Sequence, residues 1–310
     1  MEKESTIKRR TFLKQLAGLS TAVLLKPTAA IAAERSAITK AIPSTGERLP
    51  VIGMGSWITF DVGSSSYERA ARTQVMQAFF DNGGALVDSS PMYGSSEEVI
   101  GEGLKTIKHK DKLFAATKVW ILGKRSGIRQ MEDSQKLWGV PRFDLMQIHN
   151  MLDWETHWET LREWKAAGRV RYVGITTSHG RRHGDVEKAM AKTPFDFVQF
   201  TYNLEAREVE QRLLPLAAER DMAVIINRPL DGGSLFRRVR GKPLPSWAAE
   251  FDCHNWVQYF LKFIVSHPAV TCAIPATSKV DHMLENMGAN FGRLPDAVMR
   301  KRMIEYFESL

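Results

Sequence analysis

Short apolar runs alternate with helical segments along most of this chain, and this alternation constrains the fold more than any other feature. Eight apolar runs are long enough for buried strands and lie at residues 51–55, 85–87, 113–117, 143–148, 170–175, 195–200, 222–226 and 270–274. Helical segments follow at residues 67–82, 97–106, 127–137, 157–167, 185–191, 208–221, 255–266, 279–288 and 296–309.

Strand–helix alternation predicts a parallel sheet, because parallel strands need a crossover connection between them. Eight such units predict a closed (β/α)8 TIM barrel of the α/β class. A turn at Pro43-Ser44-Thr45-Gly46 predicts an additional N-terminal hairpin outside the main core. A doubly wound open sheet is the alternative, although Gly53-Met54-Gly55 is only a fragment of a dinucleotide-binding fingerprint.

Composition excludes several classes of protein. The chain has 310 residues, of which 44% are hydrophobic and 25% charged, and its net charge is +8. Residues 1–32 hold six basic and two acidic residues, so the remainder carries only +4, too little to indicate nucleic-acid binding. Cys253 and Cys272 could form one disulfide, and neither has a histidine at zinc-like spacing, so no metal site is expected.

The first 32 residues have the pattern of a signal peptide. A basic head at residues 8–14 precedes a modest apolar run at 16–25 and small residues at 30–32. Arg9-Arg10, followed by Thr-Phe-Leu-Lys, resembles a twin-arginine export signal. We therefore expect a signal peptide over residues 1–32, cleaved near Ala32 or Ala33, and a barrel domain over residues 33–310.

This reading predicts a partner, the twin-arginine export machinery, and a periplasmic or otherwise exported location. The apolar run is too short to span a bilayer comfortably, so the mature form should have no stable membrane span. Two alternatives remain: an amphipathic N-terminal helix of a cytoplasmic protein, and an uncleaved signal that acts as an anchor.

Polar residues follow three neighbouring apolar runs at the point where each run ends. Asp88, Lys118 and His149 occupy these positions, and Tyr93 lies in the loop after Asp88. In a barrel, the carboxyl ends of the strands face one mouth, and neighbouring strands lie about 5 Å apart. We therefore expect these four side chains to converge there.

Together the four groups would make Tyr93 an acid whose pKa is adjusted by its neighbours. A free tyrosine has a pKa near ~10, and an adjacent ammonium from Lys118 should lower the pKa of Tyr93. Asp88 would keep Lys118 charged, and His149 would share a hydrogen bond at the same oxygen. Such a site can protonate an oxyanion made by hydride transfer from a nicotinamide.

Several segments resemble the aldo-keto reductase superfamily in order and spacing, over nearly all of residues 40–290. They lie at residues 87–94, 116–119, 144–149, 168–175, 197–203, 274–279 and 285–286. By this resemblance, Tyr93 is the proton donor, Lys118 and Asp88 tune it, and His149 positions the carbonyl group. The substrate would be a small-molecule aldehyde, ketone or alcohol.

The resemblance also implies a cofactor site. Gln199 matches the residue that holds the nicotinamide carboxamide, and Thr176 and Thr177 stand where a Ser-Asn pair usually assists. The residues that match the loop and helix start around the adenosine phosphate and adenine are Thr277, Ser278, Lys279, Glu285 and Asn286. A helix N-terminus favours a phosphate independently of any family.

This sequence departs from the family pattern around the cofactor. Asn227 stands where an aromatic side chain often stacks on the nicotinamide, and Arg228 beside it could reach the pyrophosphate. His282 and Ala276 replace an arginine and a lysine that are common in the family. On balance NADP(H) is favoured over NAD(H).

Trp57, Trp120 and Met92 lie in loops at the same mouth and could line an apolar substrate pocket. The basic loop at residues 178–183 could border the pyrophosphate or be solvated. The resulting prediction is an NAD(P)-dependent carbonyl reductase or alcohol dehydrogenase. A nicotinamide-binding regulatory subunit on the same barrel and a metal-dependent barrel hydrolase are the alternatives.

Overall fold

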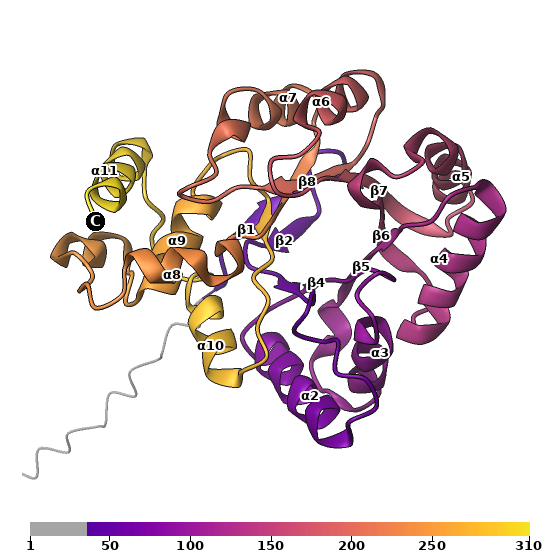
Figure 1. The fold of residues 1–310 in the computed structure, drawn as a ribbon, viewed down its shortest axis with the longest axis horizontal. Helices are drawn as coiled ribbons and strands as arrows, with labels where there is room; N and C mark the ends of the chain where they lie inside the picture. Colours follow the sequence, from indigo (N-terminus) through magenta and orange to yellow (C-terminus); the bar gives the residue numbers. More distant parts are fainter. Residues whose placement is uncertain (1–35) are drawn as a thin grey trace, which may run out of the picture. The chain divides into compact units, whose positions relative to one another are not determined.

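The computed structural model describes residues 36–310, and the predicted signal peptide and its cleavage site lie outside this range. Within it, eight parallel strands form a barrel surrounded by helices (Figure 1). The strand order runs β3 to β10 without interruption, and parallel bridges Ile52↔Ala273 and Gly55↔Ala276 join the two ends of the sheet. The predicted (β/α)8 barrel is therefore confirmed.

The strands of the barrel are two to seven residues long and largely buried, as expected of parallel strands. They are β3 Met54–Gly55, β4 Leu86–Asp88, β5 Phe114–Val119, β6 Phe143–Ile148, β7 Val170–Thr176, β8 Phe197–Thr201, β9 Ala223–Asn227 and β10 Cys272–Ala273. The α-helices are α2 Ser66–Asp81, α3 Ser96–Thr106, α4 Lys124–Trp138, α5 Trp154–Ala166, α6 His183–Lys192, α7 Leu213–Glu219, α8 Ser234–Arg238, α9 Trp256–Val265, α10 Val280–Gly288 and α11 Ala297–Glu308. Short 3-10 helices span Lys110–Lys112, His149–Met151, Glu208–Glu210, Asp231–Gly233 and Ser246–Phe251.

Gly55 in β3 and Gly53 just before it allow the barrel to close. A Cβ atom added to Gly55 would lie 2.8 Å from the carbonyl oxygen of Ile274, and one added to Gly53 would lie 2.8 Å from that of Leu86. Both approaches are too close for any side chain. The Gly53-Met54-Gly55 pattern is therefore explained by contact between backbones.

The predicted N-terminal hairpin is present and packs against one end of the barrel. Strands β1 Thr39–Ala41 and β2 Arg48–Pro50 pair antiparallel, with Lys40 opposite Leu49. Ile42 and Leu49 join a buried cluster with Phe114 and Phe197, which begin strands β5 and β8. The hairpin therefore covers the amino-terminal end of the barrel and leaves the carboxyl-terminal end for the site.

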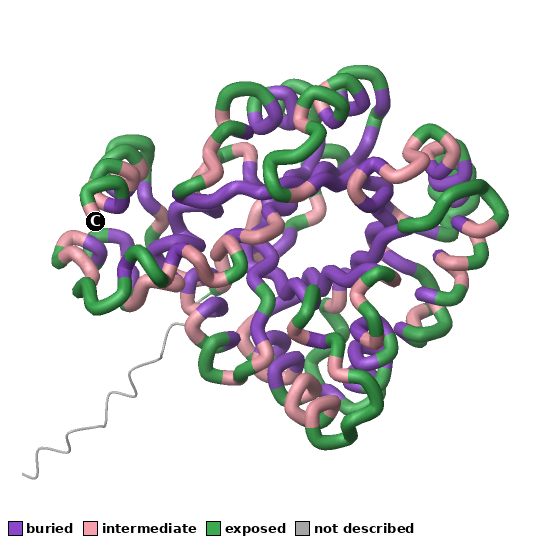
Figure 2. Tube along the Cα trace, viewed as in Figure 1, coloured by how far each residue is buried: buried purple, intermediate pink, exposed green. Residues whose placement is uncertain are grey.

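The larger apolar cluster lies outside the sheet, between the strands and the helices. Figure 2 shows a buried inner ring of strands with exposed residues on the outer faces of the helices. This is the pattern expected of a parallel barrel, whose strands are covered on both faces.

Both cysteines are buried and free, so the disulfide that the sequence allowed is not formed.

One predicted helix is divided in two, whereas most of the others differ from their predicted bounds by up to three residues at an end. The segment predicted as one helix over residues 208–221 divides into the 3-10 turn Glu208–Glu210 and helix α7. A continuous helix would place the Pro215 ring against the carbonyl group of Gln211, so the helix starts again at Leu213, with Pro215 in its first turn. Within residues 36–310, no helix is both long and apolar enough to cross a membrane.

Candidate active site

The register of the sheet aligns the polar residues at the carboxyl-terminal end of the barrel. Asp88 ends β4 and pairs with Ala116, and Lys118 lies two residues further along β5, opposite Gln147 of β6. His149 follows directly after β6. Since alternate residues of a strand share a face, Lys118 and Gln147 project toward the side chain of Asp88.

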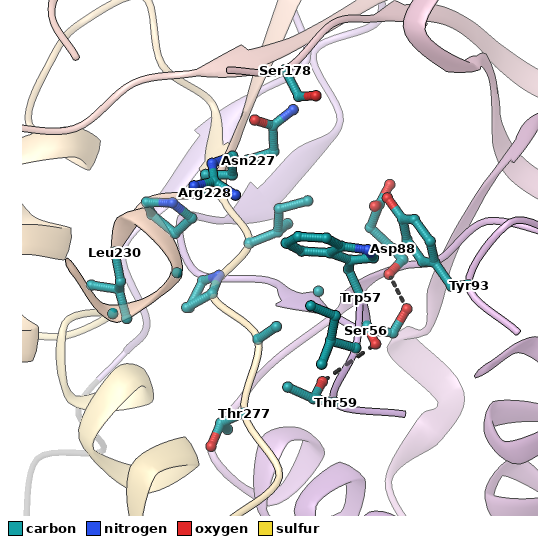
Figure 3. Close-up of a pocket in the computed structure, with 18 of the residues that line it drawn as sticks. Ser56, Trp57, Thr59, Asp88, Tyr93, Ser178, Asn227, Arg228, Leu230 and Thr277 are labelled. Carbon is teal, nitrogen blue, oxygen red and sulfur yellow. Dashed lines mark hydrogen bonds between the residues drawn. The ribbon is translucent and has the colours of Figure 1, made fainter. Parts of the chain in front are cut away.

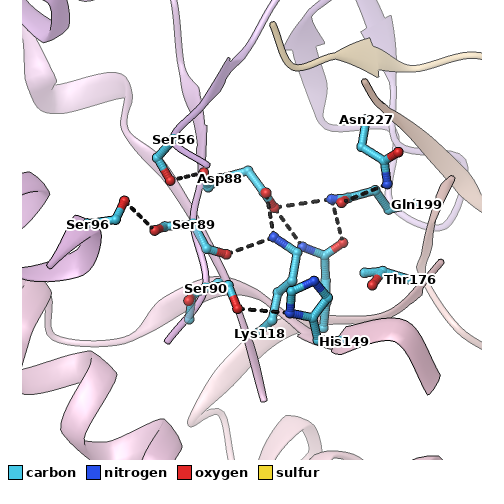
Figure 4. Close-up of polar contacts among 12 residues, drawn as sticks. Ser56, Asp88, Ser89, Ser90, Ser96, Lys118, His149, Thr176, Gln199 and Asn227 are labelled. Carbon is cyan, nitrogen blue, oxygen red and sulfur yellow. Dashed lines mark hydrogen bonds and ion pairs between the residues drawn. The ribbon is translucent and has the colours of Figure 1, made fainter. Parts of the chain in front are cut away.

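Asp88 is the centre of a buried hydrogen-bond network (Figure 4). Its Oδ2 atom lies 2.5 Å from Lys118 Nζ, which also donates to the carbonyl oxygen of Ser89 at 2.7 Å. Its Oδ1 atom accepts hydrogen bonds from the side-chain amides of Gln147 at 2.9 Å and Gln199 at 3.2 Å. Lys118 is 0% exposed, so this ion pair is fully removed from water.

Tyr93 and His149 complete the predicted group of four. Lys118 Nζ lies 5.2 Å from the centre of the Tyr93 ring, and the rings of Tyr93 and His149 meet edge to face with centroids 5.7 Å apart. Tyr93 is half-buried and His149 is buried. The structure therefore brings all four residues together at the mouth of the barrel.

The ion pair keeps Lys118 charged. Burial by itself would lower the pKa of Lys118, but the neighbouring Asp88 carboxylate and Tyr93 phenol more than offset it, so the pKa is raised. Burial, together with the nearby Lys118 ammonium, lowers the pKa of His149 to about 2. The site therefore combines a permanent cation with a neutral imidazole.

The direction of the Tyr93 shift differs from the sequence-based expectation. Burial raises the pKa of Tyr93, and the opposing effect of Lys118 is smaller. The expectation considered only the ammonium and omitted the loss of hydration of the phenolate. Tyr93 therefore holds its proton at neutral pH, with a cation in place to stabilise the phenolate when the proton leaves.

Two residues of this network were missed in the sequence. Gln147, which is 0% exposed, alternates with His149 along one strand, and that spacing could have placed both on the barrel's inner face. Ser90 places its hydroxyl oxygen 2.9 Å from His149 Nδ1. No sequence signal marks that contact, since it joins two loops 59 positions apart.

A cavity of about 720 Å³ opens beside the network (Figure 3). It extends from Tyr93 and His149 at one end to Glu285 and Asn286 of α10 at the other. The predicted site residues that line it are Trp57, Asp88, Met92, Tyr93, His149, Thr176, Gln199, Asn227, Arg228, Thr277, His282, Glu285 and Asn286. This volume falls in the range of a cofactor site.

Five predicted site residues do not line the cavity. Lys118 lies behind Asp88, and Thr177 uses its hydroxyl to donate to the carbonyl oxygen of Arg181 at 2.5 Å. Ser278 and Lys279 lie at the start of α10 without reaching the cavity. Trp120 is also outside the cavity, but its ring lies 6.4 Å from the His149 ring, so it remains close to one of the four converging residues.

Asn227 stands where an aromatic side chain was expected, and both the nitrogen and the oxygen of its amide form hydrogen bonds. Its Nδ2 atom donates to the carbonyl oxygen of Thr177 at 2.8 Å and to Gln199 Oε1 at 3.3 Å. Its Oδ1 atom accepts a hydrogen bond from Thr201 at 2.7 Å. Asn227 therefore extends the Asp88 network across strands β8 and β9 and fixes the orientation of the Gln199 amide.

Arg228 projects into the cavity from a left-handed backbone conformation, with φ at 47°. Its Nη2 atom lies 2.7 Å from Asp231, and its guanidinium lies 6.0 Å from the Trp57 ring. The buried Nε–H group has no hydrogen-bond partner among residues 36–310. Arg228 brings a positive charge to the lining of the cavity, which fits an anionic ligand such as a pyrophosphate.

The far end of the cavity is formed by the β10–α10 connection. Thr277 lies there and accepts a hydrogen bond from the Lys279 backbone at 3.1 Å, which orders the loop before the helix. The free N–H groups of the first turn of α10 follow. Together with Arg228, these N–H groups give the cavity lining a charge that fits the phosphates of a dinucleotide. Among residues 36–310, no group of three or more His, Cys, Asp or Glu side chains could hold a metal ion.

Comparisons with known proteins identify relatives of this chain. The family model described as aldo/keto reductase family matches residues 51–302. Aldo-keto reductase YhdN of Bacillus subtilis (strain 168) is 27% identical over 209 residues, which cover 63% of this chain and 62% of that protein, less than two thirds of its length. Methylglyoxal reductase YeaE of Escherichia coli (strain K12) is 24% identical over 243 residues, covering 77% of this chain and 84% of that protein.

A solved structure gives the same fold. The aldo/keto reductase from Klebsiella pneumoniae, in complex with NADP and acetate, matches with a TM-score of 0.67 and 21% sequence identity. The match covers 84% of this chain and 93% of that one. At this level of identity the match supports the barrel fold.

Proposed function

Because the chain belongs to the aldo/keto reductase family, we propose that it transfers a hydride between NADP(H) and an aldehyde or ketone, or the corresponding alcohol, with Tyr93 as the general acid and base. The observation that carries this proposal is the position of Tyr93. Its ring lies within 5.2 Å of a fully buried ammonium, beside His149, at one end of a dinucleotide-sized cavity.

In this proposal, bound NADP(H) supplies or accepts the hydride, and the protein manages the proton. Tyr93 donates its proton to the carbonyl oxygen of the substrate, and Lys118 stabilises the phenolate that remains. Asp88 holds the Lys118 ammonium in place through their 2.5 Å contact. His149, neutral because burial lowers the pKa of its ring to about 2, can hydrogen-bond to the same substrate oxygen without adding charge.

NADP(H) is favoured by the cavity and by the relatives. The Klebsiella pneumoniae structure was solved with NADP, and a Phanerodontia chrysosporium relative is described as aryl-alcohol dehydrogenase [NADP(+)]. In this chain, Thr277 and His282 line the adenosine end of the cavity, with Lys279 beside them. The substrate end is apolar and half-open, with Trp57 43% and Met92 37% exposed, which favours an apolar carbonyl compound.

The Tyr93→Phe variant tests this assignment. We expect turnover of NADPH with a panel of aldehydes and ketones to fall by about 10²- to 10⁴-fold, the usual contribution of a positioned acid. Binding of NADPH, measured by calorimetric titration, should not change. Tyr67 is 79% exposed, so Tyr67→Phe is the matched control and should behave as wild type. Full turnover by Tyr93→Phe would overturn the role of Tyr93.

A nicotinamide-binding regulatory subunit is the second candidate function, and Asn227 is the observation that favours it. The amide of Asn227 is held by three hydrogen bonds and offers no aromatic face for a nicotinamide ring. Tight NADPH binding by the wild-type protein, with no turnover across the panel in either direction, would select this function over the first.

We further propose that residues 1–32 direct export through the twin-arginine pathway, to the periplasm or beyond. The support is the sequence alone, with Arg9-Arg10 ahead of an apolar run and small residues. In a bacterial host with this pathway, the wild-type protein should be recovered outside the cytoplasm with an N-terminus near residue 33 or 34. The double variant Arg9→Lys, Arg10→Lys should stay in the cytoplasm at full length, and its export would contradict the proposal.

A further inference from the structure

Ser90 contacts His149, whose proton could lie on either of its two ring nitrogens. It lies in the loop after β4, is 0% exposed, and places its hydroxyl oxygen 2.9 Å from His149 Nδ1 (Figure 4). The other ring nitrogen, Nε2, belongs to a side chain that lines the cavity. The contact with Ser90 can therefore decide which ring nitrogen carries the proton.

Only one proton is available to the ring. Burial, followed by the nearby Lys118 ammonium, lowers the pKa of His149 to about 2, so the imidazole is neutral at physiological pH. A neutral imidazole carries its proton on Nδ1 or on Nε2 but not on both. Its partner at the other nitrogen normally selects the form.

The surroundings of Ser90 distinguish the two forms. The backbone N–H group of Met92 donates to Ser90 Oγ at 3.4 Å, which uses one of its lone pairs. If Ser90 donates its own proton to His149 Nδ1, every polar group in this contact is satisfied. If His149 Nδ1 donates instead, the Ser90 hydroxyl proton has no other acceptor among residues 36–310, an unfavourable state for a buried donor.

We propose that Ser90 is a positioning residue that holds His149 in its Nε2–H form, so that the imidazole presents a hydrogen-bond donor to the cavity. The inference deepens the proposed carbonyl reduction and rests on it for its catalytic meaning. A carbonyl oxygen can only accept hydrogen bonds, so an Nε2 lone pair would repel it, whereas Nε2–H adds a second donor beside Tyr93. The edge-to-face contact of Tyr93 with His149, at 5.7 Å, places both groups near one substrate oxygen.

The protonation of the ring can be measured directly on the whole protein. In protein labelled with ¹⁵N-histidine, the two ring nitrogens of His149 differ in NMR shift according to which carries the proton. The signals are assigned by their loss in the His149→Gln variant. At neutral pH, wild-type protein should show Nε2 protonated and Nδ1 unprotonated. Protonated Nδ1 in the wild-type protein would overturn the proposal without any variant.

Variants then test whether Ser90 sets this form. Ser90→Ala should move the His149 signals toward the Nδ1–H form, and Ser90→Thr, which keeps the hydroxyl, should restore the wild-type signals. Ser96 is also 0% exposed and its hydroxyl contacts Ser89 instead, so Ser96→Ala is a matched control that should leave His149 unchanged. Wild-type signals in Ser90→Ala would show that Ser90 does not select the form.

Turnover separates this inference from the proposed function. Ser90→Ala should lower kcat by about 2- to 10-fold, the usual effect of one neutral hydrogen bond, with little change in NADPH affinity. The NMR result does not depend on turnover. If no carbonyl compound is reduced but the Nε2–H form is observed and lost in Ser90→Ala, the proposed function fails and the role of Ser90 in ring protonation stands. If turnover is normal and the wild-type ring is the Nδ1–H form, the hydride transfer with Tyr93 as acid stands, whereas the Ser90 inference and the hydrogen bond from His149 to the substrate oxygen both fail.

Discussion

Replacing Lys118 with methionine should destabilise the protein strongly, because it leaves Asp88 as an unpaired buried charge. The two side chains are 0% and 3% exposed, and their charged atoms lie 2.5 Å apart. At an effective dielectric constant of about 20, charges at this distance attract by about 7 kcal/mol, most of which offsets their lost hydration. Removing one partner forfeits the attraction and leaves the hydration cost, so we expect Lys118→Met to lower the free energy of unfolding by about 3–5 kcal/mol.

The double variant Asp88→Asn, Lys118→Met isolates the charge from the packing. The amide that replaces the Asp88 carboxylate would keep the oxygen that accepts from Gln147 and Gln199 while removing the stranded charge. We expect the double variant to recover at least about 2 kcal/mol relative to Lys118→Met, since replacing both members of a buried pair is often nearly neutral.

Urea unfolding at pH 7, followed by tryptophan fluorescence, measures these differences. Lys136→Met provides the matched control, because Lys136 pairs with Asp133 at 2.9 Å and the two side chains are 76% and 56% exposed. Its loss should leave the stability nearly unchanged. The reasoning is refuted if Lys118→Met costs less than about 1 kcal/mol, or if the double variant is less stable than the single one.

Three other predictions concern single side chains. Because burial lowers the pKa of His149 to about 2, the pH profile of turnover should show no limb from this ring between pH 5 and 8; a limb that disappears in His149→Gln would contradict this. Because Arg228 lines the cavity with a positive charge, Arg228→Met should weaken NADPH binding by about 10- to 100-fold in calorimetric titrations, the effect of one charge-assisted hydrogen bond, while Arg212→Met, at an exposed pair, should not. Lys262 donates to three backbone carbonyl groups while 0% exposed, so Lys262→Met should cost about 3 kcal/mol and lower Tm by several degrees. Lys301→Met, at a site 79% exposed, is its control, and equal losses in both would remove the buried contacts as the cause.

The positions of the strands and of the polar residues at their ends could be predicted, because both depend on the local pattern of apolar and polar residues. An apolar run that ends in a polar residue indicates a buried strand with a functional end, and parallel strands share one end. Asp88, Lys118 and His149 follow from this rule, and the structure brings them together. The prediction of one helix over residues 208–221 was wrong because the break before Pro215 was overlooked, although the proline is visible in the sequence.

Other features could not be predicted because they depend on distances between remote segments. Loss of hydration, which decides the direction of the Tyr93 pKa shift, is set by every element that packs around the ring. The contact between Ser90 and His149 joins two loops whose conformations are fixed only by the closed barrel.

Local patterns in the amino-acid order indicate eight strand–helix units and the polar residues at the strand ends, because hydrophobic periodicity and strand ends are local properties. The tertiary structure decided that the sheet closes into a barrel and is not an open sheet, since the closing bridges join residues far apart in the chain. The pKa values and hydrogen bonds of these polar residues depend on the folded chain. Side chains that are far apart in the sequence meet at the site, as Gln199 does with Asp88, and they set the burial and the hydrogen-bond partners of Tyr93 and His149. Electrostatic energies depend strongly on these distances, which the amino-acid order does not give.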